Sequence, residues 1–506
     1  MTVARTLAVA LHGVDGALVE IEADLANGLP AFTIIGLPDA ALGEAKDRVR
    51  SAAVNSGCDL PARKVTVNLS PASLPKHGSG FDLGIAVAAL ATTGVVSTEA
   101  IDGVVHLGEL SLDGRLRPVA GVLPAVLAAR RAGARAVVVP SGNGDEARLV
   151  PGIRVIAATS LRDVLITHGA PLDPVAVDAL LAPAHAEPDV AFGDLADVIG
   201  HPEAVEALQV AAAGGHHMLM VGPPGAGKTL LASRLPGLLP DLDPDAAVEV
   251  SSIRSLAGLP LGSSLVTRPP LESPHHSATM ASLVGGGSGL VRPGAISRAA
   301  HGVLFLDEAP EFAGAVLDAL RQPLETGEIT IHRARSTARF PARFQLVLAA
   351  NPCPCGQGGA DDCTCTPLMR RRYFGRLSGP LLDRIDLHLT VRRVSVAQLT
   401  EGAHGAITTV QARERVSAAR ERTRERWGAH GWNLTAHVPG SIVRSPQWRL
   451  PAPDRASLDR ALERGALTMR GYDRVLRVAW TLADLDAVQR PNAEHVGRAL
   501  FLRKGI

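Results

Sequence analysis

The sequence predicts an α/β protein with more than one domain, and three observations support this prediction. The chain has 506 residues, more than one hydrophobic core usually organises. Short β-branched segments alternate with Ala-rich helical segments over most of its length. Apolar residues make up 46% and charged residues 20%, with a net charge of +1, as in a globular protein. A disordered chain or a polycation is therefore excluded, and nucleic acid would have to bind a local basic patch.

The first part of the chain, residues 1–168, is expected to be an α+β domain. The segment 64–68 (KVTVN) has the composition of a strand, and the segment 85–91 that of a helix. Residues 169–189 come next; they are rich in Pro and Ala and contain four acidic residues but no basic one. This composition predicts a linker.

Residues 190–395 are expected to form a parallel sheet with crossover helices, and residues 396–506 a helical C-terminal domain. The most apolar window, 82–96, is shorter than the roughly 20 residues that a membrane helix needs. The N-terminus lacks the pattern of a secretory leader. We therefore expect a cytoplasmic protein without a membrane partner.

A glycine-rich loop between an apolar strand and a helix predicts a nucleotide site. It has the spacing GxxxxGKT, in which backbone N–H groups turn toward phosphates at a helix N-terminus. Lys228 is expected to reach the β- and γ-phosphates of ATP, and the Thr229 hydroxyl to bind Mg²⁺. The predicted cofactor-binding residues are Gly222, Pro223, Pro224, Gly225, Ala226, Gly227, Lys228, Thr229 and Leu230.

Two later strands end in polar residues that would complete such a site. The apolar segment 302–306 leads to Asp307, expected to complete the Mg²⁺ shell through water, and Glu308, expected to polarise the attacking water. The segment 344–350 ends at Asn351, placed to sense the γ-phosphate. The order of these elements resembles that of AAA+ ATPases.

That resemblance assigns roles to arginines further along the chain. Arg384 follows Leu-Leu-Asp, where an arginine finger would reach the nucleotide of a neighbouring subunit; a salt bridge within the chain is the alternative. Arg470, and after it Arg474, resemble the second sensor residue of ring helicases, although either could be an ordinary helix surface charge.

Several longer motifs resemble one branch of this superfamily, the YifB/ComM family of magnesium-chelatase-like AAA+ ATPases. They include PHHS at 274–277, LRQPLE at 320–325, NPCPCG at 351–356 and LSGPLLDRIDLH at 377–388. The resemblance covers the whole chain. It implies a P-loop AAA+ core, a helical lid like the magnesium-chelatase C-terminal domain, and a homo-hexameric ring helicase. Its partner would be single-stranded or branched DNA during branch migration in natural transformation.

The first domain resembles the Lon protease domain, an α+β fold of the S5 domain 2-like type. Gly80 stands at the position of the nucleophilic serine in the segment 75–82, and Leu123 at that of the catalytic lysine. A serine/lysine protease needs both groups, so this domain is expected to be catalytically inactive.

Four of the five cysteines lie within thirteen residues: Cys353, Cys355, Cys363 and Cys365. Four thiolates on a short loop can close a tetrahedral structural zinc site. Reactive thiols and ordinary packing are the alternatives. A disulfide framework is not expected in the cytoplasm.

Basic residues concentrate between Ile331 and Arg376, with eight arginines against two aspartates. The segment from Glu328 onward is expected to be a hairpin, and its arginines Arg333, Arg335 and Arg339 are the predicted DNA contacts. Some of the arginines in this stretch could instead serve subunit interfaces. The alternative function is a chelatase-type ATPase that remodels a protein partner.

Overall fold

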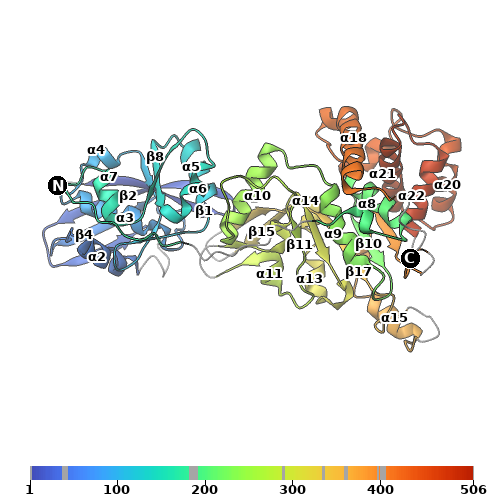
Figure 1. Cartoon of the computed structure of the whole chain (residues 1–506), viewed down its shortest axis with the longest axis horizontal. Coiled ribbons are helices and arrows are strands. Elements are labelled where there is room, and N and C mark those ends of the chain that lie inside the picture. Colours follow the sequence, from blue (N-terminus) through green and yellow to red (C-terminus); the bar gives the residue numbers. More distant parts are fainter. Residues whose placement is uncertain are drawn as a thin grey trace.

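A computed structural model describes residues 3–36, 44–181, 192–287, 291–332, 337–357, 363–395, 398 and 406–504. The chain forms three parts in a row (Figure 1): the N-terminal domain at one end, the nucleotide-binding core in the middle and the helical lid at the other end. Among the described residues, no helix is long and apolar enough to cross a membrane. The mixed α/β fold with a helical C-terminal part is confirmed.

The N-terminal domain is built on a seven-stranded sheet with the order β3-β4-β2-β1-β5-β8-β9. The strands are β1 (Ala4–His12), β2 (Asp15–Ala26), β3 (Ala31–Ile35), β4 (Lys64–Ser70), β5 (Val104–His106), β8 (Ala136–Pro140) and β9 (Arg154–Ala158). Successive residues of β1 point to opposite faces, so Ala8 and Ala10 pack with α3 (Asp82–Ala91) while Val9 packs with α5 (Val122–Arg131). The sheet therefore has helices on both faces.

The core is built on a five-stranded parallel sheet with the order β11-β14-β17-β10-β18. These strands are β10 (Met218–Val221), β11 (Leu271–Glu272), β14 (Val303–Leu306), β17 (Gln345–Ala350) and β18 (Leu387–Thr390). The three central strands are buried at every residue, which requires helices on both faces and explains their unbroken apolar sequence. Helices α8 (Pro202–Gly214), α9 (Lys228–Leu238) and α10 (Pro244–Ala257) belong to this part.

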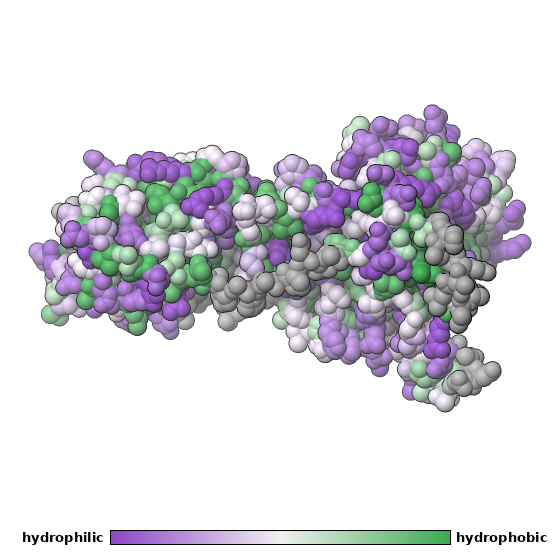
Figure 2. All heavy atoms as spheres, in the orientation of Figure 1, coloured by the Kyte–Doolittle hydropathy of each residue, from purple (hydrophilic) through white to green (hydrophobic). Residues whose placement is uncertain are grey.

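The lid consists mainly of α18 (Thr409–Trp427), α20 (Ala452–Glu463), α21 (Met469–Leu485) and α22 (Ala493–Lys504). Trp427, Trp448 and Trp480 pack edge to face at its centre, with ring centroids 5.4–5.8 Å apart. Hydrophilic side chains cover most of the lid surface that Figure 2 shows.

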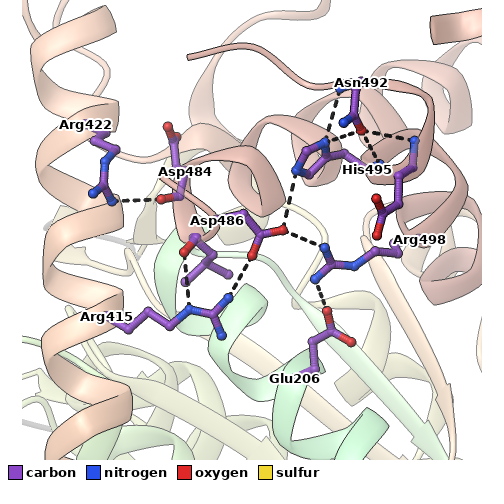
Figure 3. A network of polar contacts seen from close by, with 10 residues as sticks. Glu206, Arg415, Arg422, Asp484, Asp486, Asn492, His495 and Arg498 are labelled. Atoms are coloured by element: carbon purple, nitrogen blue, oxygen red, sulfur yellow. Dashed lines mark hydrogen bonds and ion pairs between the residues drawn. The ribbon is translucent and has the colours of Figure 1, made fainter. Parts of the chain in front are cut away.

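A network of charges joins the lid to α8 of the core (Figure 3). Asp486 lies at its centre, 2.8 Å from the Arg415 guanidinium of α18 and 2.6 Å from that of Arg498 on α22. Arg498 also pairs with Glu206 of α8. Two lid helices are thus tied to the helix that precedes β10.

The N-terminal domain is packed directly against the core. A β-hairpin of the core, β15 (Glu328–His332) with β16 (Thr337–Pro341), forms a backbone bridge from Arg339 to Gly13 in the β1–β2 turn. Gly13 has φ +69°, and a Cβ there would lie 1.9 Å from the Arg339 carbonyl oxygen. Leu11, Leu256 and Phe340 share an apolar cluster across this junction.

Candidate functional site

The candidate nucleotide site lies where three neighbouring parallel strands end. The glycine-rich loop follows β10, Asp307 follows β14, and Asn351 follows β17. Because these strands are adjacent and parallel, their carboxyl ends bring the three segments to one edge of the sheet. The residues predicted around the phosphates therefore converge.

Lys228 is the first residue of α9, and its ammonium group is held inside the loop. The residue is 8% exposed, and Nζ donates to the carbonyl oxygens of Gly222 at 2.6 Å and Pro223 at 3.0 Å and to Asn351 Oδ1 at 3.1 Å. Burial lowers the pKa of this lysine, and the carboxylates of Asp307 and Glu308 oppose that shift. Incoming phosphate oxygens would replace the carbonyl partners, and the lysine already contacts the predicted sensor.

The residues predicted for Mg²⁺ lie close enough to share one ion. The Thr229 hydroxyl donates to Asp307 Oδ2 at 2.6 Å. Oxygen ligands of Mg²⁺ lie about 2.1 Å from the ion, so two neighbouring ligands are about 3 Å apart. A hydroxyl and a carboxylate are oxygen donors of the kind this ion prefers, so the pair fits Mg²⁺ beside a bound triphosphate.

Glu308 has a partner that the sequence did not predict. Its carboxylate lies 3.2 Å from His276 Nδ1, and its backbone has φ +50°. His276 follows the edge strand β11, which pairs with β14. Because those strands are parallel, the PHHS motif lies at the same sheet edge as Glu308. Only this strand pairing indicates that the two side chains meet. The His276 imidazole contacts one oxygen of the Glu308 carboxylate, and that oxygen would otherwise face water.

We expect His276→Ala to raise ATP hydrolysis by the chain alone about threefold, because the Glu308 carboxylate would be released to polarise water. Phosphate release in the absence of any partner measures the effect. His301→Ala is the matched control, since the His301 imidazole pairs with Glu249 at 2.8 Å rather than with Glu308 and should leave the rate unchanged. A slower His276→Ala variant would show instead that the histidine supports catalysis.

Arg384 and Arg470 lie at the other end of the sheet. Met218 is paired with Leu387 and Val221 with Thr390, so residues before Leu387 lie beside the amino end of β10. There Arg384 pairs with Glu325, and Arg470, 75% exposed, donates to Asp383 at 2.9 Å. Neither arginine contacts the phosphate loop of its own chain in the described structure.

Arg474 differs from Arg470 because it forms an ion pair with a buried carboxylate. It is paired at 2.5 Å with Asp386, which is 2% exposed. Burial alone would raise the pKa of Asp386, but Arg474 and His216 outweigh it and hold that pKa well below its usual range. Arg474 is thus engaged inside the protein, whereas Arg470 is exposed at the surface.

Family models for the magnesium-chelatase subunit ChlI match three segments: "Subunit ChlI of Mg-chelatase" residues 21–143, "Magnesium chelatase, subunit ChlI" residues 194–399, and its C-terminal model residues 406–503. The chain is 42% identical to the competence protein ComM of Haemophilus influenzae, over 99% of this chain and 98% of ComM. The chain belongs to the YifB/ComM family of magnesium-chelatase-like AAA+ ATPases. YifB of Escherichia coli is 40% identical over 97% of this chain and 95% of YifB.

A more distant relative extends the comparison to the chelatases themselves. The magnesium-chelatase 38 kDa subunit of Cereibacter sphaeroides is 28% identical over 41% of this chain and 53% of that subunit. As a member of the YifB/ComM family of AAA+ ATPases, the chain is an ATPase that uses ATP and Mg²⁺.

The Lon-like positions in the N-terminal domain are packed or engaged. Leu123 is 1% exposed in an apolar cluster, and the Ser79 hydroxyl donates to the Glu109 carboxylate. Lys76 is fully buried, and Nζ donates to the carbonyl oxygens of Gly36, Leu69 and Pro71. The Lys76 ammonium group is therefore fully engaged inside this domain.

The four clustered cysteines come together after β17. Their sulfur atoms all lie within 4.8 Å of one another, and Cys363 Sγ is 3.8 Å from Cys353 Sγ and 3.7 Å from Cys355 Sγ. None of the five cysteines forms a disulfide. The cluster could bind a metal.

The basic stretch falls on separate surfaces. Arg339 is exposed on β16; Arg333 and Arg335 lie outside the described residues. A second group, Arg370, Arg371 and Arg372, lies on α15 (Pro367–Phe374), which projects from the core beyond β17 (Figure 1). Arg376 pairs with Glu311 at 3.0 Å. The hairpin and α15 are therefore two distinct candidates for binding phosphate.

Proposed function

We propose that this ATPase assembles into a homo-hexameric ring in the cytoplasm and uses ATP hydrolysis to move along DNA, driving branch migration of recombination intermediates. The observation that supports a ring is that the phosphate-binding residues and the two arginines lie at opposite ends of the core sheet. Lys228, Asp307 and Asn351 lie at one edge of the sheet, and Arg384 and Arg470 at the other. A second copy is needed to bring both halves together.

In this mechanism Glu308 polarises the attacking water, and Lys228 binds the transferred phosphate with Mg²⁺ beside Thr229 and Asp307. A neighbour's Arg384 stabilises the charge that develops, and its Arg470 supports the same phosphate. The N-terminal domain takes no part in peptide hydrolysis, because Gly80 and Leu123 supply neither a nucleophile nor a base.

The DNA contact is assigned to the hairpin. Arg339 is exposed on β16, and Arg333 and Arg335 come between β15 and β16 in the sequence. Arginine–phosphate contacts give affinity that does not depend on base sequence and that falls with salt. The relative ComM is named a competence protein, which is consistent with work on incoming DNA.

A chelatase-type ATPase that remodels a protein is the second candidate, favoured by the three ChlI matches along the chain. It uses the same nucleotide chemistry but needs no DNA. Dependence of the ATPase rate on DNA therefore separates the two candidates.

We expect single-stranded or forked DNA to stimulate ATP hydrolysis. The DNA concentration that gives half-maximal stimulation should increase as the salt concentration increases. Replacing Arg333, Arg335 and Arg339 by alanine should raise the required DNA concentration about tenfold or more. The matched control removes the same charge from α15, at Arg370, Arg371 and Arg372, and should behave like the unmodified chain. A branch-migration assay with Lys228→Ala as the inactive motor completes the test. No response to DNA at any salt concentration would favour the protein remodeller.

Zinc is proposed as the metal of the cysteine cluster. Four ligands about 2.3 Å from one tetrahedral ion lie about 3.8 Å apart, close to the two Cys363 separations. Four thiolates leave no open position, so this ion would be structural.

A further inference from the structure

The cysteine loop is attached to the nucleotide site at both of its ends. Cys353 comes two residues after Asn351, which contacts Lys228. Beyond the loop, α15 begins at Pro367 and carries Tyr373, which is 4% exposed and lies against the backbone of Asn351. The chain thus leaves Asn351, passes through the four cysteines and returns to Asn351.

The loop also presses on the phosphate-binding loop itself. Gly356, between the two cysteine pairs, has φ +82°, and a Cβ there would lie 2.7 Å from both Cγ and Cδ of Pro224. That separation is shorter than real Cβ contacts allow. The backbone at Gly356 therefore lies directly against Pro224, within the predicted phosphate-binding residues.

A metal would add a constraint to the described part of this loop. A backbone hydrogen bond closes its first turn, from the Gly356 N–H to the Cys353 carbonyl at 2.9 Å, and the sulfur atoms contact one another. Cys355 is exposed and Cys363 half-buried, so packing contributes little there. An ion bound by all four sulfurs would hold the two ends of the loop together.

We propose that the metal-bound cysteine loop is a brace for the nucleotide site: it fixes Asn351 and supports Pro224, so that metal loading sets the affinity for ATP and ADP. The loop binds zinc, a divalent ion, with its four thiolates in a tetrahedral arrangement. Zinc changes nucleotide affinity through two contacts, Gly356 with Pro224 and Tyr373 with Asn351. This inference rests on the proposed metal and on the nucleotide site, but not on DNA as the substrate.

The test measures zinc per chain and the dissociation constant of a fluorescent ADP analogue, with the full chain and without DNA. Cys363→Ser should lose the zinc and bind ADP about tenfold more weakly. Cys58→Ser, which changes the one cysteine outside the cluster, should keep about one zinc per chain and normal affinity. Gly356→Ala keeps all four ligands, so it should retain zinc and still bind ADP more weakly, because its methyl group displaces Pro224.

A second measurement guards against variants that do not fold. Zinc is removed from the unmodified chain by dialysis against a strong chelator, and is then restored. ADP affinity should fall and recover, while circular dichroism stays unchanged. Equal affinity of the zinc-free and zinc-loaded chains would overturn the brace, and so would freshly purified protein without metal. Because DNA is absent throughout, failure of the DNA motor leaves these results unaffected.

Discussion

We expect Glu308→Gln to abolish ATP hydrolysis and to preserve ATP binding. The amide cannot act as a base toward water, and this role is typically worth about 100-fold or more in rate. Lys228, Thr229 and Asp307 remain in place, so phosphate and Mg²⁺ contacts are kept. Steady-state phosphate release gives the rate, and binding of a fluorescent ATP analogue gives the affinity.

Glu311→Gln is the matched control for this substitution. Glu311 lies three residues further on and pairs with Arg376 rather than facing the glycine-rich loop. Its hydrolysis rate should stay within about twofold of that of the unmodified chain, as expected for an exposed ion pair. If Glu308→Gln retained more than half of the rate, another residue would have to polarise the water.

Mixing two inactive variants, Arg384→Ala and Lys228→Ala, should restore ATP hydrolysis. Arg384→Ala alone is expected to lose about 1000-fold in rate, since an arginine finger is typically worth that much. Lys228→Ala alone should also be inactive, because it loses the lysine contact with the transferred phosphate. In a mixed ring, an Arg384→Ala subunit keeps its own Lys228 and receives Arg384 from a Lys228→Ala neighbour. The ATPase rate measured against the mixing ratio should rise and then fall.

A second mixture makes this experiment decisive. Lys228→Ala mixed with Glu308→Gln should stay inactive at every ratio, because both changes damage the same half of the site and no intact site can form. Glu325→Ala tests the alternative role of Arg384, its ion pair within the chain. If Glu325→Ala reproduced the loss and the first mixture stayed inactive, Arg384 would be a structural residue.

The half of the site around the phosphates was predictable because its residues follow strands in the sequence. The glycine-rich loop that leads to Lys228, and also Asp307 and Asn351, each come directly after an apolar strand, and parallel pairing places the ends of these strands together. The YifB/ComM resemblance, carried by longer motifs along the whole chain, is confirmed by the comparisons.

What the sequence did not predict depends on contacts between distant segments. The pairing of His276 with Glu308 requires β11 to lie beside β14, and nothing local to either residue specifies this. The buried position of Lys76 depends on the carbonyl oxygens of Gly36, Leu69 and Pro71, which only the fold brings around its ammonium group. Arg339 and the group Arg370 to Arg372 fall in one basic stretch of the sequence, but β17 and the loop after it separate β16 from α15.

The junction between the N-terminal domain and the core has a consequence for dissecting the protein. Leu256 and Phe340 are fully buried partly by Leu11 and Val14 of the β1–β2 hairpin. The Ser255 hydroxyl donates to the Glu146 carboxylate across the same junction at 2.5 Å. An ATPase core expressed without residues 1–168 would therefore expose the apolar surface around Leu256 and Phe340 and would tend to aggregate. We therefore expect residues 1–168 to be needed for the solubility of the core, although they carry no Lon-type catalytic pair.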